Sequence, residues 1–183
     1  MIHYAITDPI YYTQETLTFT LKLENVLLDN RVDFICYRDK ENNNYETMAE
    51  IFIKEVARFS HTKALLHSKV DLAHSLGAYG VHLPSSSFSE IAKAKAFGLY
   101  VVVSTHSEEE ALHAQKLGAD VVTFSPIYTT PNKGNPRGLD ALKQIVDKIT
   151  INVVALGGIT TQKQLQDVEK TGAFGFASIR YFI

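Results

Sequence analysis

The sequence contains little of what several protein classes require. Among its 183 residues there is a single cysteine, Cys36, and no tryptophan. One cysteine excludes an intramolecular disulfide and makes a cysteine-based zinc site a poor hypothesis. The first eight residues lack the basic and apolar regions of a secretory signal, and no apolar run approaches the roughly 20 residues of a membrane-spanning helix. We therefore expect a cytoplasmic protein with a reduced thiol and no membrane partner.

An excess of charge of either sign is also missing. The chain has 18 Lys and Arg against 20 Asp and Glu, a formal net charge of −2, so general affinity for nucleic acid is not expected. Hydrophobic residues make up 45% of the chain, which is enough to form a folded core and excludes disorder as the main state. The length suits one domain, so we expect residues 1–183 to form a single domain.

Short apolar runs alternate with longer helical patterns along the whole chain. Most of these runs are apolar throughout rather than alternating, which indicates strands that are buried on both faces of a parallel sheet. Helices are predicted at 14–28, 47–59, 107–117, 139–148 and 161–171, although alternate threonines in 14–28 would also suit a strand. Strands are predicted at 3–7, 33–37, 64–67, 80–83, 100–105, 121–126, 152–156 and 174–179.

Eight strands with intervening helices predict an α/β fold, specifically a (β/α)8 TIM barrel. Three Gly-Ala pairs, at 77–78, 118–119 and 172–173, each close a helical pattern before a strand and support a repeated βα unit. The chain is shorter than the usual ~200–250 residues and stops just after the eighth strand, so the last helix is expected to be missing or truncated. This would leave apolar surface near strands seven, eight and one, a candidate homodimer contact. An open doubly wound sheet is the alternative.

The loops that follow the strands are rich in positive charge. In a TIM barrel these loops form the mouth that binds ligands, and a basic mouth attracts a small anion. Gly157-Gly158 follows strand seven, where backbone N–H groups and a helix N-terminus suit a phosphate, and Arg180 after strand eight adds a guanidinium. The basic residues expected at the mouth are Arg38, Lys40, Lys69, Lys133, Arg137 and Arg180, against the acidic Asp8 and Asp39.

Several segments, in order along nearly the whole chain, resemble the thiamine-phosphate synthase and thiazole tautomerase family. The resemblance implies a barrel in thiamine biosynthesis that binds a small phosphorylated heterocycle, a thiazole phosphate. It also implies substrate contacts from Arg38, Lys40, Ser104, Thr130 and Lys133, and phosphate contacts from Gly157, Gly158, Ile179 and Arg180. The segments are Tyr4-Ala5-Ile6-Thr7-Asp8, Tyr37-Arg38-Asp39-Lys40, Gly80-Val81-His82-Leu83-Pro84-Ser85, Val103-Ser104-Thr105-His106, Pro126-Ile127-Tyr128-Thr129-Thr130 and Ala155-Leu156-Gly157-Gly158-Ile159-Thr160.

The sequence departs from both branches of this family. The synthase branch joins a hydroxymethylpyrimidine diphosphate to the thiazole phosphate with Mg²⁺, but His67-Ser68 replaces its Asn-Asp and its second metal-binding Asp falls near Ser87. We therefore expect no metal ligands and no cofactor, with Mg²⁺ only if the synthase alternative holds. The segment 83–89 looks more like the tautomerase branch, whose acid–base histidine would fall at about Pro126.

His67 is then the candidate catalytic residue, because a proton transfer at carbon favours a group that titrates near neutral pH. His82 also lies on a predicted strand, with its side chain pointing either into the barrel or outward beneath a helix. The leading hypothesis is a tautomerase-like isomerase or a catalytically reduced relative. The alternatives are a thiamine-phosphate synthase and a non-catalytic phosphate-ligand-binding or regulatory protein.

Overall fold

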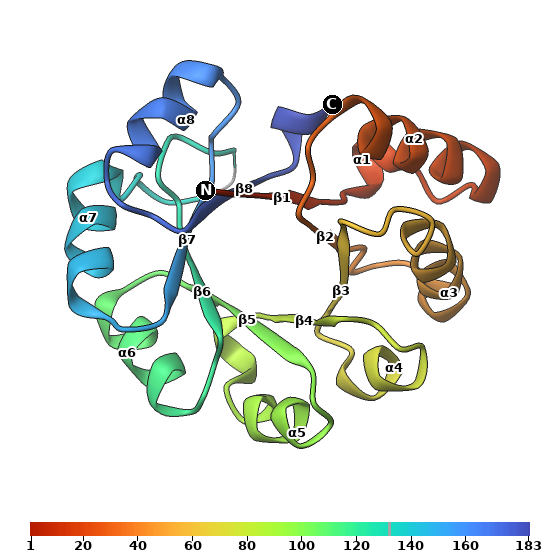
Figure 1. Cartoon of the computed structure of the whole chain (residues 1–183), viewed down its shortest axis with the longest axis horizontal. Coiled ribbons are helices and arrows are strands. Elements are labelled where there is room, and N and C mark those ends of the chain that lie inside the picture. Colours follow the sequence, from red (N-terminus) through yellow and green to blue (C-terminus); the bar gives the residue numbers. More distant parts are fainter. Residues whose placement is uncertain (132) are drawn as a thin grey trace.

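The computed structural model describes residues 1–131 and 133–183. In this part of the chain eight parallel strands form a closed barrel with neighbours in sequence order, and the helices lie outside it (Figure 1). The predicted TIM barrel is thus confirmed and the open sheet is excluded. The strands are β1 Ile2–Ile6, β2 Phe34–Tyr37, β3 Lys63–His67, β4 Gly80–Leu83, β5 Tyr100–Thr105, β6 Val121–Phe124, β7 Asn152–Leu156 and β8 Gly175–Ser178. The helices are α1 Pro9–Tyr12, α2 Thr16–Asp29, α3 Tyr45–Val56, α4 Val70–Ser75, α5 Glu90–Ala96, α6 Glu108–Lys116, α7 Gly138–Lys148 and α8 Gln162–Glu169.

The ambiguous segment 14–28 is helical, as its position between two strands predicted. Glu15 caps α2, and its carboxylate accepts hydrogen bonds from the backbone N–H groups of Leu17 at 3.0 Å and Thr18 at 2.8 Å. These bonds satisfy donors that the first turn of a helix leaves free. The helix begins two residues later than predicted because the short helix α1, capped by Asp8, precedes it.

Apolar side chains form two cores, one inside the barrel and one between the sheet and the helices. The interior core is filled by alternate residues of the strands, so no open channel runs through the barrel. Two polar side chains, His82 of β4 and Ser104 of β5, also point into the barrel, toward the carboxyl ends of the strands. The buried apolar residues of the interior are Tyr4, Ile6, Cys36, Leu65, Val102, Val121, Val154 and Ala177.

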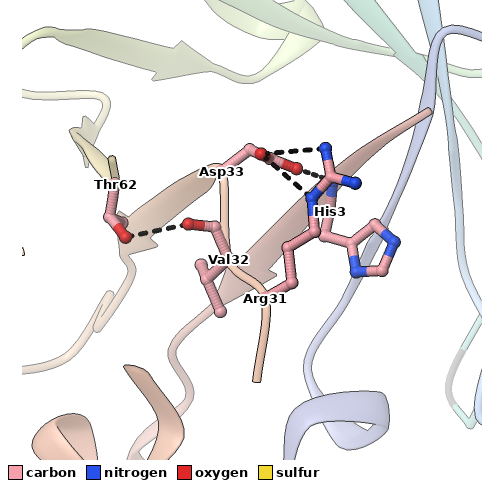
Figure 2. A network of polar contacts seen from close by, with 5 residues as sticks. All are labelled: His3, Arg31, Val32, Asp33 and Thr62. Atoms are coloured by element: carbon pink, nitrogen blue, oxygen red, sulfur yellow. Dashed lines mark hydrogen bonds and ion pairs between the residues drawn. The ribbon is translucent and has the colours of Figure 1, made fainter. Parts of the chain in front are cut away.

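A polar network ties β1 to β2 at the amino ends of the strands, opposite the mouth (Figure 2). Asp33 accepts a hydrogen bond from the backbone N–H of His3 at 2.8 Å and an ion pair from Arg31 at 3.3 Å. Nearby, the hydroxyl of Thr62 donates to the carbonyl of Val32 at 2.8 Å. The bond between Asp33 and His3 joins the start of β2 to β1, and the bond between Thr62 and Val32 joins the segments that precede β3 and β2.

The last helix of the barrel is reduced to a single 3₁₀ turn, Arg180–Phe182, as the length of the chain predicted. Phe182 is buried and stacks on Phe176 of β8 with ring centroids 5.6 Å apart. The side-chain amide of Asn30 donates to the carbonyl of Phe182 at 3.4 Å. The turn lies beside α1 (Figure 1) and covers part of the surface that a helix would otherwise bury. The homodimer contact remains a prediction.

Replacing Phe182 with Ala should destabilise the barrel because it removes a buried ring that stacks on Phe176 of β8. We expect a loss of roughly 3 kcal/mol in the free energy of unfolding, measured by urea titration. Ile183→Ala is the control, since Ile183 is 46% exposed. A Phe182→Ala protein as stable as this control would show that the turn does not contribute to the fold.

Candidate functional site

A pocket of about 310 Å³ opens at the carboxyl ends of β2, β3 and β4. The loop after β2 and the end of β3 with its following loop supply equal shares of its lining. Tyr45, the first residue of α3, closes one side and donates its hydroxyl to the carbonyls of Tyr37 at 3.1 Å and His67 at 3.3 Å. The lining residues are Asp39, Lys40, Asn42, Tyr45, His67, Ser68, Lys69 and Pro84.

His67 lies in this pocket, where the sequence placed the catalytic candidate. Its Nδ1 is 2.9 Å from the hydroxyl of Ser68, a residue with a left-handed backbone at φ 62°. Burial, followed by the positive charges of Arg38 and Lys40, lowers the pKa of His67 to about 4. The imidazole is therefore neutral near pH 7. In this form it can accept a proton, but it is not an imidazolium cation that could donate one.

Positive side chains from two distant loops meet at the rim of the pocket. Partial desolvation, and then the charges of Arg38 and Lys133, lower the pKa of Lys40. Lys133 thus lies close enough to Lys40 to repel it, although it belongs to the loop after β6. Arg38 is partly neutralised by Asp8, with Nη1 3.4 Å from Oδ2. Of the predicted substrate residues, Lys40 lines the pocket, and the charges of Arg38 and Lys133 act on it.

The carboxylates at the mouth do not fit a resident Mg²⁺ site. Asp39 is 5% exposed and accepts a hydrogen bond from Gln14 at 2.8 Å, while its Oδ1 is buried without a partner. Asp8 is engaged by Arg38 and by the N–H of Ile10. In residues 1–131 and 133–183 no three His, Cys, Asp or Glu side chains come together as metal ligands. Mg²⁺ usually takes one or two carboxylates, and the one that lines this pocket, Asp39, is already bound by Gln14 and stands among lysines that compete with a cation for it.

The glycine pair after β7 is required by packing in the structure. Gly157 and Gly158 have φ values of 99° and 73°, in the region that favours glycine. A Cβ on Gly157 would lie 2.9 Å from Cα of Pro126, and one on Gly158 would lie 2.7 Å from the carbonyl of Thr129. The two loops also pair through the N–H of Tyr128 and the carbonyl of Gly157 at 3.0 Å. Phosphate binding at the glycine pair remains a prediction.

The remaining predicted residues lie around the same rim. Thr130 donates to the carbonyl of Tyr128 at 3.0 Å, and its Oγ1 would lie 3.3 Å from a Cβ on Gly157. Ile179 packs against the interior core, so its backbone rather than its side chain could meet a phosphate. Arg180 is exposed at the start of the C-terminal turn. Their roles toward a ligand remain predictions.

Ser104 has a partner that the sequence did not predict. Its hydroxyl is 2.9 Å from Nε2 of His82, and Nδ1 of His82 is 2.8 Å from the hydroxyl of Tyr4. His82 therefore points into the barrel, which decides between the two orientations left open by the sequence. Tyr4 was missed because it occupies an inward position of an apolar strand, where a tyrosine resembles any large core residue.

Comparisons with known proteins agree with this architecture. The profile of a family described as "Thiamine monophosphate synthase" matches residues 3–182. The chain belongs to this family. A protein of Aquifex aeolicus named "Putative thiamine-phosphate synthase 2" is 38% identical over 186 residues, which cover 98% of this chain and 96% of that protein. The thiamine-phosphate synthase of Lawsonia intracellularis is 33% identical over 183 residues, covering 93% of this chain and 79% of its own.

A solved structure gives the same result for the fold. The thiamine phosphate pyrophosphorylase of Pyrococcus furiosus superposes with a TM-score of 0.83 at 27% identity, covering 97% of this chain and 85% of the other. The family predicted from the motifs is thus confirmed. The tautomerase-type branch, which the segment 83–89 favoured, is not distinguished by these relatives, and their names favour the synthase.

No helix in the described residues is long and apolar enough to cross a membrane.

The histidines at the mouth should make the protein less stable in acid. Burial is the main cause that lowers the pKa of His82 to about 3, and the pKa of His67 is lowered to about 4. An unfolded histidine has a pKa near 6.5. Between about pH 6.5 and 4 the unfolded chain therefore binds protons that the folded chain does not, and the free energy of unfolding falls as the pH falls.

Urea titrations at pH 7.5, 6.0 and 5.0 measure this dependence. His67→Gln should reduce its slope, whereas His61→Gln, at an exposed position, should leave it unchanged. Equal slopes for the wild type and His67→Gln would contradict a neutral His67 in the folded protein.

Proposed function

We propose that this protein is a thiamine-phosphate synthase, which joins a hydroxymethylpyrimidine diphosphate to a thiazole phosphate and releases pyrophosphate. The observation that carries the proposal is the positive charge at the mouth, where Lys40 lines the pocket and the charges of Arg38 and Lys133 act on it. Relatives named thiamine-phosphate synthase that align over nearly the whole chain support it. The synthase thereby replaces the tautomerase-like isomerase as the leading hypothesis.

The electrostatics of the pocket suit a reaction that expels a highly charged anion. When the bond from the pyrimidine methylene carbon to the diphosphate oxygen breaks, the electron pair leaves with the diphosphate, and negative charge grows on its oxygens. Cationic side chains held in place before the reaction stabilise such charge without reorganising. The lowered pKa of Lys40 reflects partial desolvation and repulsion from Arg38 and Lys133. A bound diphosphate would relieve that repulsion.

Around this centre the chain's own residues bind and orient the substrates. Ser104 and Thr130 would contact the heterocycles, and the backbone around Gly157 and Gly158, with Arg180, would hold the thiazole phosphate. The neutral His67 would lie beside the diphosphate without adding to the charge. Because the described carboxylates do not fit a resident Mg²⁺, no step is assigned to a metal held by the protein.

Replacing Lys40 with Ala tests the role of the cationic pocket. With both substrates and excess Mg²⁺, we expect the wild type to release pyrophosphate and the variant to lose at least tenfold in kcat/KM, which corresponds to about 1.4 kcal/mol of transition-state stabilisation. Lys54→Ala is a matched control, because Lys54 lies exposed on α3 and pairs with Glu50. Absence of pyrophosphate release from the wild type would refute the proposed reaction.

An isomerase is the second candidate, and the position of His67 favours it. The imidazole lies in the ligand pocket, hydrogen-bonded to Ser68, where it can accept a proton from a carbon atom, but its pKa of about 4 makes it a weaker base near pH 7 than the sequence led us to expect. If the protein isomerises a thiazole carboxylate phosphate, His67→Gln should reduce that turnover by at least a hundredfold while binding of the thiazole phosphate persists. Proton exchange into the substrate, followed by NMR in D₂O, separates this outcome from transferase activity, for which His67→Gln should have a smaller effect.

A further inference from the structure

A continuous chain of hydrogen bonds runs from the interior of the barrel to the mouth. It starts at the hydroxyl of Tyr4 on β1, passes through both ring nitrogens of His82 on β4 and ends at the hydroxyl of Ser104 on β5, with links of 2.8 and 2.9 Å. Tyr4 is 1% exposed and His82 is 3% exposed, whereas Ser104 is half-buried. The chain thus reaches the ligand side of the barrel at Ser104.

Two directions of donation are open to such a chain. Burial lowers the pKa of His82 to about 3, so the ring is neutral and carries one N–H. In the first arrangement Tyr4 donates to Nδ1 and the Nε2–H donates to Ser104. In the second, Ser104 donates to Nε2 and the Nδ1–H donates to Tyr4. The hydroxyl hydrogen of Ser104 is free for a ligand only in the first arrangement.

The surroundings of Tyr4 favour the first arrangement. Burial, and then the neighbouring Cys36, raise the pKa of Tyr4 well above its usual value, so its hydroxyl stays protonated. In the second arrangement that buried hydroxyl would need another acceptor. The neighbouring polar group is the thiol of Cys36, whose pKa burial raises to about 12, and sulfur is a weak acceptor. A buried donor without a good acceptor is costly, so donation from Tyr4 to His82 is preferred.

We propose that Tyr4 and His82 are positioning residues that hold the Nε2–H of His82 on Ser104 and so turn the Ser104 hydroxyl into a donor toward the mouth. Ser104 then selects a ligand that presents a hydrogen-bond acceptor there, such as an unprotonated ring nitrogen or a phosphate oxygen, and disfavours one that presents an N–H. This inference rests on the proposed function in one respect, that a phosphorylated heterocycle occupies the mouth.

The direction of donation can be measured on the ligand-free protein. Long-range ¹H–¹⁵N correlation spectra of ¹⁵N-histidine-labelled protein at pH 7.5 distinguish the two neutral tautomers, and the spectrum of His82→Gln identifies the signals of His82. We expect the Nε2–H tautomer in the wild type and in Tyr100→Phe, a control that removes a hydroxyl from the other end of the same interior. Tyr4→Phe should shift the ring toward a mixture of tautomers. An Nδ1–H tautomer in the wild type would overturn the proposal.

A double-mutant cycle tests whether Tyr4 acts through Ser104. Calorimetric titration with thiazole phosphate should show about fivefold weaker binding by Tyr4→Phe and by Ser104→Ala, and little further loss when both are combined. Equal effects of Tyr4→Phe with and without the Ser104 hydroxyl would contradict the proposal. If the wild type does not bind thiazole phosphate, the proposed function is wrong. The proposed orientation of Ser104 is still tested in that case, because the tautomer of His82 is measured without ligand.

Discussion

The parallel pairing of β1 with β8 closes the sheet, and this closure brings the carboxyl ends of all the strands to one rim. Lys40 and Lys133, which follow β2 and β6, meet there because the barrel is closed; in an open sheet the same loops would be separated by the intervening strands. The network of Asp33 with His3 and Arg31 holds the opposite end of β1 and β2 in register. Every contact of the mouth therefore depends on a closed sheet with a fixed register.

The closure also explains why the histidines of the mouth are neutral. His67 and His82 lie with ring centroids 6.2 Å apart, and the positive charge of Arg38 acts on both. Burial and neighbouring positive charge act in the same direction on an imidazole, and no described carboxylate opposes them among the causes that shift the pKa of either ring. Histidines in this setting act as neutral hydrogen-bonding groups, while Arg38, Lys40 and Lys133 provide the charge that attracts an anion.

The sequence predicted the barrel well because its strands are short apolar runs separated by helical patterns, and because α4, α5, α6 and α8 are each followed closely by a glycine. Apolar runs and helical periodicity are properties of local sequence, and they remain visible without coordinates. Which face of a strand a polar residue occupies is not visible when both faces are buried, since alternation is then lost. His82 could thus be assigned to β4 but not to the interior, and the bond from Tyr4 to His82 joins residues far apart in sequence. The effect of Lys133 on Lys40 and the buried, unpaired oxygen of Asp39 also depend on tertiary structure, so the sequence could not predict them.

The residues that bind the anion suit both the synthase and the isomerase reaction. The residues beside the anion decide which reaction the mouth favours. Arg38, Lys40 and the glycine loop suit a phosphorylated ligand in either reaction, and the positive charge that Arg38 and Lys133 add around Lys40 suits best the more highly charged diphosphate of the synthase. The difference lies at His67-Ser68, where a neutral imidazole stands in place of the amide and carboxylate that the synthase motif implies. In a transferase this exchange removes a metal ligand next to the leaving group and leaves its charge to the cationic side chains. In an isomerase the same imidazole supplies the base. The identity of the reaction thus depends on whether the substrate presents a departing diphosphate or an acidic carbon to His67.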